Sequence, residues 1–317
     1  MGPVPLSFDV TSALPEDVTG GLPTQIAAWL FAPDDLSLLG PRPVSMVLLA
    51  GGSYDKRYFH FEVPGREGYS CAEYLAGKGN VVLLADHLGV SDSTRVPDQK
   101  KATRQIVAQA MDAAARQFHD RVAGGTLHSA LPPLPNVLQV GGGHSMGAML
   151  TTIQQALFET YHGIMFLGYT AEGVHMTAGG RKFRAATLIE GAADFPDYTV
   201  VDRASQHESF HWDDVPADVI AVDDALAVET PSAIGVVSIR THIIRDEAAR
   251  ITAPMFFSNG ERDVSPDLHA EPGYFPSCDD FTLHLLPKSG HCHNFAGTRN
   301  EQWERMHRWA KSLTGGA

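Results

Sequence analysis

The run Val137-Leu138-Gln139-Val140-Gly141-Gly142-Gly143-His144-Ser145-Met146-Gly147 is the most informative part of this chain. Four residues of strand character lead into a glycine-rich turn, and a segment with helical spacing follows. Gly143, Ser145 and Gly147 fit Gly-x-Ser-x-Gly, in which a sharp strand-to-helix turn holds a serine in strained backbone geometry. Both glycines are needed because a β-carbon at either position would clash. We therefore predict that Ser145 is a nucleophile, with a helix N-terminus that stabilises nearby negative charge.

A serine hydroxyl is a poor nucleophile at neutral pH and needs an imidazole base, which a carboxylate in turn orients. After the apolar strand 254–257 comes a loop that carries carboxylates at a strand's C-terminal end, where the sites of parallel sheets form. We predict that Asp263 in this loop is the acid. Glu261 and Asp267 are the competing carboxylates.

The base is expected in the loop 286–293, which precedes the last predicted helix. Of its two histidines, His291 comes directly after Gly290, and we predict that it is the base. His293 lies two residues further on and stays open as the alternative. A metal site at His291, Cys292 and His293 would need further ligands at the spacing of a metal motif, so we predict no metal.

The anionic intermediate of acyl transfer requires hydrogen-bond donors that are already in place. We expect one donor from Met146, which follows the nucleophile, and one from the loop Ala50-Gly51-Gly52-Ser53, where we favour Gly52. Glycines in this loop let the backbone approach a substrate oxygen closely. Residues beside these donors are predicted to contact the substrate: Ser53, Tyr54 and His144.

Strand-like and helical segments alternate along most of the chain, which is typical of a parallel sheet with helices on its faces. We expect strands at 25–31, 44–49, 81–85, 137–140, 164–168, 254–258 and 281–286. We expect helices at 71–76, 100–122, 145–160 and 299–313. Residues 5–11 and 24–32 are expected to form an antiparallel hairpin on this sheet.

Residues 171–250 interrupt the alternation, because they are rich in Asp and Ala and carry aromatic residues without a clear period. We interpret them as a cap inserted between two parts of one core, residues 1–170 and 251–317. Phe210 and Trp212 of this cap are predicted to line the substrate pocket, although aromatic residues of an insertion also pack it onto its host.

Three blocks of the chain resemble the α/β-hydrolase family, and together they extend over nearly its whole length. The first is the turn around Ser145. The second, residues 48–54, resembles the family's oxyanion loop, with Ala50 in place of the common histidine. The third, residues 82–93, resembles the family's Asp-x-x-Gly-x-Gly-x-Ser turn, with Ser91 in place of the second glycine.

The resemblance implies an α/β-hydrolase fold, with a mostly parallel central sheet flanked by helices and an inserted cap. It also implies that Asp86 is structural, and the order Ser145, Asp263, His291 is the one expected for this architecture. Epoxide hydrolases and haloalkane dehalogenases of the family use an aspartate as nucleophile, so the serine disfavours both. Nucleotide cofactors are disfavoured because Met146 occupies the third glycine position of Gly-x-Gly-x-x-Gly.

The charge composition indicates which classes of binding partner the chain disfavours. Of the 317 residues, 24 are Lys or Arg and 37 are Asp or Glu, which gives a net charge of −13. Such a surface repels phosphate backbones and anionic lipids, so we predict neither a nucleic-acid nor a membrane partner. Three cysteines without Cys-x-x-Cys spacing argue against a disulfide framework, and the start of the chain lacks a signal-peptide pattern. A cytoplasmic location is predicted, and a homodimer stays open.

These observations predict a cofactor-independent serine hydrolase that acts on a small molecule, cleaving a carboxylic ester, lactone or thioester through an acyl-enzyme. Two alternatives remain. The same residues could serve a carbon–carbon bond hydrolase, lyase or cyclase that acts on a natural-product intermediate. The fold could also serve a non-catalytic small-molecule receptor, for which a pocket without fast chemistry would be enough.

Overall fold

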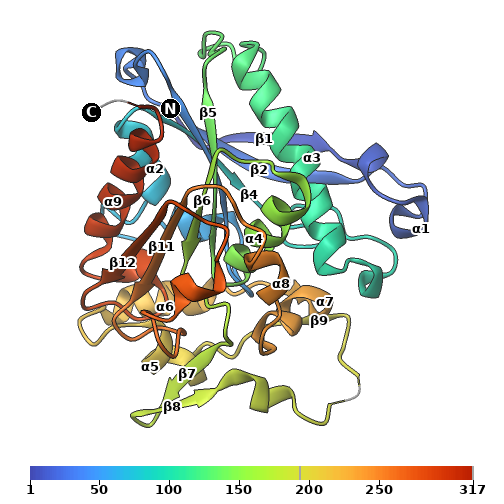
Figure 1. Cartoon of the computed structure of the whole chain (residues 1–317), viewed down its shortest axis with the longest axis vertical. Coiled ribbons are helices and arrows are strands. Elements are labelled where there is room, and N and C mark those ends of the chain that lie inside the picture. The colour runs from blue at the N-terminus through green and yellow to red at the C-terminus, as the bar shows by residue number, and fades with distance from the viewer. Residues whose placement is uncertain (193, 316–317) are drawn as a thin grey trace.

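A computed structural model describes residues 1–192 and 194–315 of the chain. Its centre is an eight-stranded sheet with the strand order β1-β2-β4-β3-β5-β6-β11-β12 (Figure 1). The strands are β1 (Val4–Asp9), β2 (Gln25–Phe31), β3 (Val44–Leu49), β4 (Asn80–Ala85), β5 (Leu138–His144), β6 (Gly163–Leu167), β11 (Met255–Gly260) and β12 (Phe281–Leu286). β2 runs antiparallel to both of its neighbours, and the other neighbouring pairs are parallel. The predicted mostly parallel sheet is confirmed.

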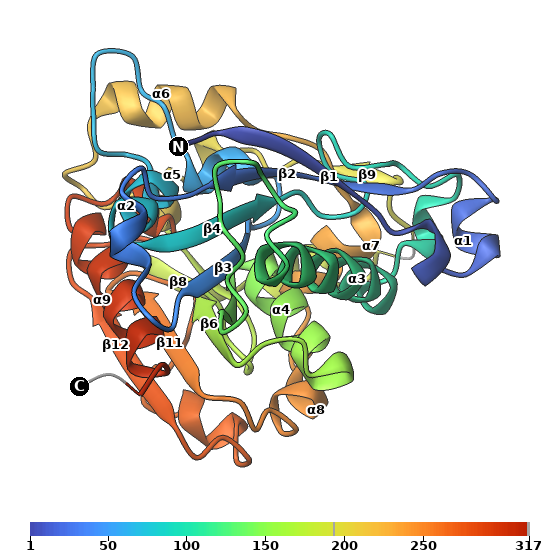
Figure 2. The same cartoon turned by 90° about the horizontal axis from the view of Figure 1, so that it is seen from above.

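The central strands are predominantly apolar because helices cover both faces of the sheet. All residues of β3, β4 and β5 are buried. On one face lie α3 (Arg104–Ala123) and α4 (Met146–Phe158), and on the other lie α2 (Cys71–Gly77) and α9 (Arg299–Ser312) (Figures 1 and 2). A short helix, α1 (Glu16–Thr19), follows β1. The two covered faces form two separate apolar clusters.

Local chemistry sets where the helices begin. The helix predicted from residue 100 starts at Arg104 instead, because the side chain of Thr103 accepts a hydrogen bond from the N–H of Ile106 and so caps it. Residues 99–101 form a separate 3₁₀ turn. The last helix, α9, buries Trp303, Met306, Trp309 and Ala310 on one stripe, as its helical spacing indicates.

Residues 168–254 connect β6 to β11 and are called the β6–β11 segment below. Their elements are β7 (His175–Ala178), β8 (Arg181–Arg184), β9 (Tyr198–Thr199), α5 (His207–Phe210), α6 (Ala217–Ala225), β10 (Thr230–Pro231), α7 (Ser232–Gly235) and α8 (Arg245–Ala248). They form two small antiparallel pairs, β7 with β8 and β9 with β10, and most of them gather at one end of the central sheet (Figure 1). The predicted domain boundaries at 171 and 250 stay a prediction.

Within the described residues, none of the helices combines the length and the apolar character that crossing a membrane requires.

Candidate active site

Ser145 occupies the turn between β5 and α4 with φ 55° and ψ −122°, a left-handed backbone that a non-glycine residue rarely adopts. The N–H of Ser145 donates to the carbonyl of Leu167 at 2.8 Å, which ties the turn to β6. A β-carbon on Gly143 would come within 2.1 Å of the backbone of Gly147, and one on Gly147 within 2.3 Å of the carbonyl oxygen of Leu49. The two glycines are therefore required by the close approach of backbone to backbone.

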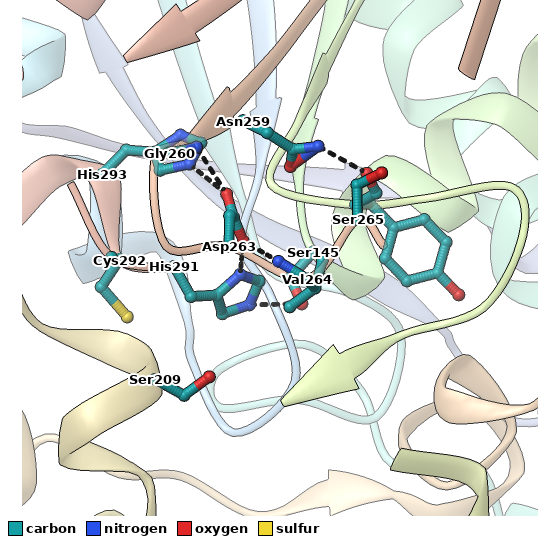
Figure 3. A network of polar contacts seen from close by, with 12 residues as sticks. Ser145, Ser209, Asn259, Gly260, Asp263, Val264, Ser265, His291, Cys292 and His293 are labelled. Atoms are coloured by element: carbon teal, nitrogen blue, oxygen red, sulfur yellow. Dashed lines mark hydrogen bonds and ion pairs between the residues drawn. The ribbon is translucent and has the colours of Figure 1, made fainter. Parts of the chain in front are cut away.

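The imidazole of His291 lies between Ser145 and Asp263 (Figure 3). Its Nε2 is 3.0 Å from the Ser145 Oγ, and its Nδ1 is 2.7 Å from the Asp263 Oδ1. Asp263 follows β11, and His291 follows the neighbouring strand β12. Parallel strands end at the same edge of a sheet, so three residues far apart in sequence meet there. This is the geometry of a nucleophile, a base and the acid that orients it.

Asp263 is buried, and both of its oxygens accept two hydrogen bonds (Figure 3). Oδ1 accepts from the N–H of Val264 at 2.7 Å besides His291, and Oδ2 accepts from the N–H of Gly260 at 2.8 Å and bonds to His293 Nε2 at 2.7 Å. Burial by itself raises the pKa of this carboxyl, but attraction and hydrogen bonds from the two histidines outweigh it and hold the pKa well below its ordinary value. Asp263 is therefore ionised at neutral pH.

The alternative candidates for the acid and the base make different contacts from those of Asp263 and His291. Glu261 is exposed and accepts from the N–H of Lys288 at 2.9 Å. Asp267 is also exposed and accepts from the N–H of His269 at 3.0 Å. His293 bonds to Asp263 on the side away from Ser145, so among the described residues His291 alone contacts both the serine and the acid.

Two backbone N–H groups, those of Met146 and Gly52, belong to the two segments that meet at Ser145. Met146 is the first residue of α4, so its N–H has no acceptor within the helix. The N–H of Gly52 donates to no group among the described residues. A β-carbon on Gly51 would lie 3.0 Å from the Ser145 Cβ, which shows how closely this loop approaches the nucleophile. Ser53, in contrast, already donates its N–H to Thr230 Oγ1 at 2.8 Å.

A cavity of about 280 Å³ opens above Ser145, between the loop 51–54 and the β6–β11 segment. Among the described residues that line it, none is Asp, Glu, Lys or Arg. The lining includes four of the residues predicted to contact substrate, namely Ser53, Tyr54, His144 and Phe210. It also includes apolar residues that the sequence did not single out: Tyr169, Val174, Met176, Ala185, Leu188, Val200, Val201, Val236, Ile239 and Val264.

Trp212 departs from its prediction, because it does not line the cavity. The guanidinium of Arg262 lies over its ring, 4.8 Å from the ring centroid. Arg262 also bonds to the carbonyl of His211 and to the Asp213 carboxylate, so the indole packs the segment onto the core. The neighbouring Phe210 does reach the cavity, and no periodicity in the sequence distinguishes the two aromatic residues.

His144 has a structural role that the sequence did not indicate. Its ring stacks on Tyr58 with the centroids 4.5 Å apart, and its Nε2 lies 2.7 Å from the carbonyl oxygen of His291. Burial, followed by the charges of His291 and His293, lowers its pKa well below the ordinary value, so the ring is neutral and donates to that carbonyl. His144 therefore holds the backbone of the predicted base in place.

Asp86, which the resemblance marks as structural, lies in a buried ion pair with Lys56, with the Nζ 2.5 Å from its Oδ2. Among residues 1–192 and 194–315, no three His, Cys, Asp or Glu side chains are arranged so that they could hold a metal ion.

Comparison with known proteins gives matches to solved structures. No protein-family model and no curated protein sequence matches the chain. A thermophilic esterase from Thermogutta terrifontis superposes with a TM-score of 0.62 at 13% identity, over 92% of this chain and 94% of its own. The N-acyl homoserine lactonase AidH, as a variant complexed with N-hexanoyl homoserine, superposes with a TM-score of 0.60 at 15% identity, over 99% of each chain. The peroxisomal α/β-hydrolase Lpx1 of Saccharomyces cerevisiae gives 0.62 at 13% identity, over 99% of this chain and 87% of its own.

The chain has the α/β-hydrolase fold. At these identities the likeness establishes the fold and not the reaction, because one fold carries many chemistries. In an α/β-hydrolase fold the carboxyl ends of the central strands carry the site, and Ser145, Asp263 and His291 all lie there.

Proposed function

We propose that this protein is a serine hydrolase that cleaves a carboxylic ester, lactone or thioester through an acyl-enzyme. The observation that carries the proposal is the relay of contacts from Ser145 Oγ to His291 Nε2, at 3.0 Å, and from His291 Nδ1 to Asp263, at 2.7 Å. We assign the N–H groups of Met146 and Gly52 as the oxyanion donors, because Met146 begins α4 directly after Ser145 and the Gly52 N–H has no acceptor among the described residues. A nucleophile with base, acid and anion-binding donors is the set that acyl transfer requires.

In the first half of the reaction, the Ser145 Oγ attacks the acyl carbonyl carbon while its proton passes to the Nε2 of His291. The carbonyl oxygen becomes an oxyanion, which the N–H groups of Met146 and Gly52 hold. The bond to the leaving alcohol or thiol then breaks, and His291 returns the proton to it. In the second half, water gives a proton to His291 and attacks the acyl carbon. The bond from this carbon to Ser145 Oγ then breaks as His291 returns the proton to Oγ, which releases the acid and restores Ser145.

The cavity supports a substrate whose bound part is uncharged and apolar, because the described lining holds no Asp, Glu, Lys or Arg. At its outer rim, Leu188, Val200 and Val201 keep 63%, 55% and 36% of their surface exposed. Exposed apolar side chains around a pocket are typical of a binding surface. We propose that the β6–β11 segment acts as a cap whose apolar side chains receive an acyl chain of short to medium length.

The experiment is a screen of p-nitrophenyl esters of graded chain length, N-acyl homoserine lactones, acyl thioesters and anilides, comparing the wild type with Ser145→Ala. The lactones enter the screen because AidH is a lactonase and superposes over nearly the whole chain. Loss of the nucleophile is expected to lower kcat by about 10⁴-fold or more. A fluorophosphonate probe should label the wild type and not the variant.

Ser45→Ala is the control for a serine-to-alanine change, because Ser45 is buried in β3 and its hydroxyl has no hydrogen-bond partner among the described residues. This control should keep full activity. A wild type that cleaves none of these substrates and resists the probe would refute the proposal. Retention of activity in Ser145→Ala would refute it as well.

A further inference from the structure

Ser53, next to the donor Gly52, has each of its polar groups bound by the β6–β11 segment. Its N–H donates to Thr230 Oγ1 at 2.8 Å, and its Oγ accepts from the N–H of Val201 at 2.8 Å. Its carbonyl accepts from Arg203 at 2.6 Å and from the N–H of Val228 at 3.1 Å. Four hydrogen bonds thus attach one residue of the loop after β3 to a segment about 150 to 180 residues further along the chain.

The backbone of Ser53 explains why such support is needed. Residues 51–54 form a turn that the N–H of Tyr54 closes by donating to the carbonyl of Gly51 at 3.2 Å. Ser53, at the third position, has φ 59°. Turns with a positive φ at this position normally place glycine there, because a β-carbon is strained in the left-handed region. Here the glycine stands one position earlier, so Ser53 carries strain that contacts from outside the turn must offset.

This turn also sets the direction of the predicted donor. The carbonyl of Gly51 and the N–H of Gly52 belong to one planar peptide unit, so the closing hydrogen bond of the turn fixes where the N–H points. Relaxation of Ser53 to a negative φ turns the adjoining peptide unit or opens the turn. When the turn opens, its closing hydrogen bond is lost, and nothing then fixes the direction of the Gly52 N–H.

Arg203 joins the contacts into one buried unit. Its guanidinium lies 3.6 Å from the centroid of the Tyr54 ring, bonds to the carbonyl of Ser53 and pairs with Asp223 of α6 at 2.9 Å. The hydroxyl of Tyr54 donates to the same carboxylate at 3.1 Å. Arg203 and Asp223 are 4% and 0% exposed, so the pair is shielded from water and its planar geometry is fixed.

We propose that Thr230 and Arg203 are positioning residues, which hold Ser53 in its left-handed conformation and so keep the N–H of Gly52 directed at the substrate carbonyl oxygen. The inference rests on the proposed ester hydrolysis. It makes the oxyanion hole depend on the β6–β11 segment being seated on the loop 51–54.

The first test is Thr230→Val, which keeps the volume and removes the acceptor for the Ser53 N–H. We expect kcat to fall about 10-fold to 100-fold, because loss of a whole oxyanion donor typically costs 10²–10³. KM should change less than threefold. The affinity for a trifluoromethyl ketone, which mimics the tetrahedral intermediate, should fall by the same factor as kcat/KM. Amide hydrogen exchange in residues 51–54 should become faster.

Thr151→Val is the matched control, because Thr151 is buried in α4 and its Oγ1 has no hydrogen-bond partner among the described residues. It should match the wild type in rate and in amide exchange. Arg203→Lys is a second variant in case Thr230→Val folds poorly. It keeps a positive charge near Asp223 but cannot reproduce two directed bonds and the stacking on Tyr54, so kcat should fall here too.

A folded Thr230→Val that keeps kcat within twofold would overturn the inference, and so would a loss confined to KM or unchanged affinity for the ketone. These results leave the proposed function intact when the wild type cleaves esters and Ser145→Ala does not. A wild type without any hydrolytic activity refutes the proposed function itself, and this inference with it.

Discussion

Asp263→Asn tests the arrangement of the site most directly, because the carboxylate accepts four hydrogen bonds. Two come from backbone N–H groups, of Gly260 and Val264, and the other two partners are His291 and His293. The amide keeps one acceptor oxygen and replaces the other with a donor. Whichever way it is oriented, its NH₂ group faces a backbone N–H that cannot become an acceptor.

The two orientations differ in their effect on the histidines. On one side, His293 can change tautomer and accept at Nε2, because its Nδ1 has no hydrogen-bond partner among the described residues. On the other side, His291 would have to carry its proton on Nε2 and could no longer accept one from Ser145. We therefore expect the NH₂ group to face His293 and Gly260. The buried N–H of Gly260 then loses its partner, which costs about 1–3 kcal/mol of stability.

The loss of activity follows from the charge. When His291 accepts the serine proton, the carboxylate of Asp263 stabilises the imidazolium across a 2.7 Å contact. Unit charges centred about 4 Å apart attract by about 4 kcal/mol in a protein environment with an effective dielectric constant near 20. The neutral amide forfeits most of this energy, so kcat/KM should fall about 10³-fold.

The assay is kcat/KM on the best p-nitrophenyl ester, with urea unfolding to measure the free energy of unfolding. Asp267→Asn is the control, since its exposed carboxylate bonds to the His269 N–H and to neither histidine of the site. It should keep wild-type activity. A folded Asp263→Asn that loses less than tenfold in kcat/KM would show that the carboxylate does not support the base.

Two further substitutions test the surroundings of the site. Gly147→Ala places a β-carbon 2.3 Å from the carbonyl oxygen of Leu49, so it should unfold the protein or lower its free energy of unfolding by more than about 3 kcal/mol in thermal or urea unfolding. The control is Gly77→Ala in α2, whose β-carbon meets nothing within 4 Å and which should be neutral or slightly stabilising. Equal stability of the two variants would contradict the steric argument. Burial lowers the pKa of His87 from 6.5 to about 4, and its Nε2 lies 2.8 Å from the carbonyl oxygen of Ala50. Between these two pH values His87 is protonated in the unfolded chain but neutral in the folded protein. The free energy of unfolding should therefore decrease as the pH falls from about 6.5 towards 4. At pH 5 this loss amounts to about 2 kcal/mol. His87→Gln keeps a hydrogen-bond donor, so its free energy of unfolding in urea should decrease less than that of the wild type between pH 7 and pH 5. Equal decreases in the two proteins would contradict this role of His87.

The sequence determined the fold and the chemical types at the site, because these depend on local pattern. Continuous apolar runs such as 46–49 in β3 and 81–85 in β4 indicate strands buried on both faces, and the glycines around Ser145 are required by the turn itself. The order of Ser145, Asp263 and His291 could be read from their places after successive strands, and parallel strands bring such residues to one edge of a sheet.

What faces the cavity was decided by tertiary packing alone. Phe210 and Trp212 are two residues apart in an irregular segment, yet one lines the cavity and the other lies under Arg262. The attachment of Ser53 to Thr230 joins loops 177 residues apart, and the second histidine on Asp263 depends on how the turn after β12 folds back. Contacts of this kind leave no periodic signal along a chain, because they are set by where two segments come to rest against each other and not by the conformation of either one.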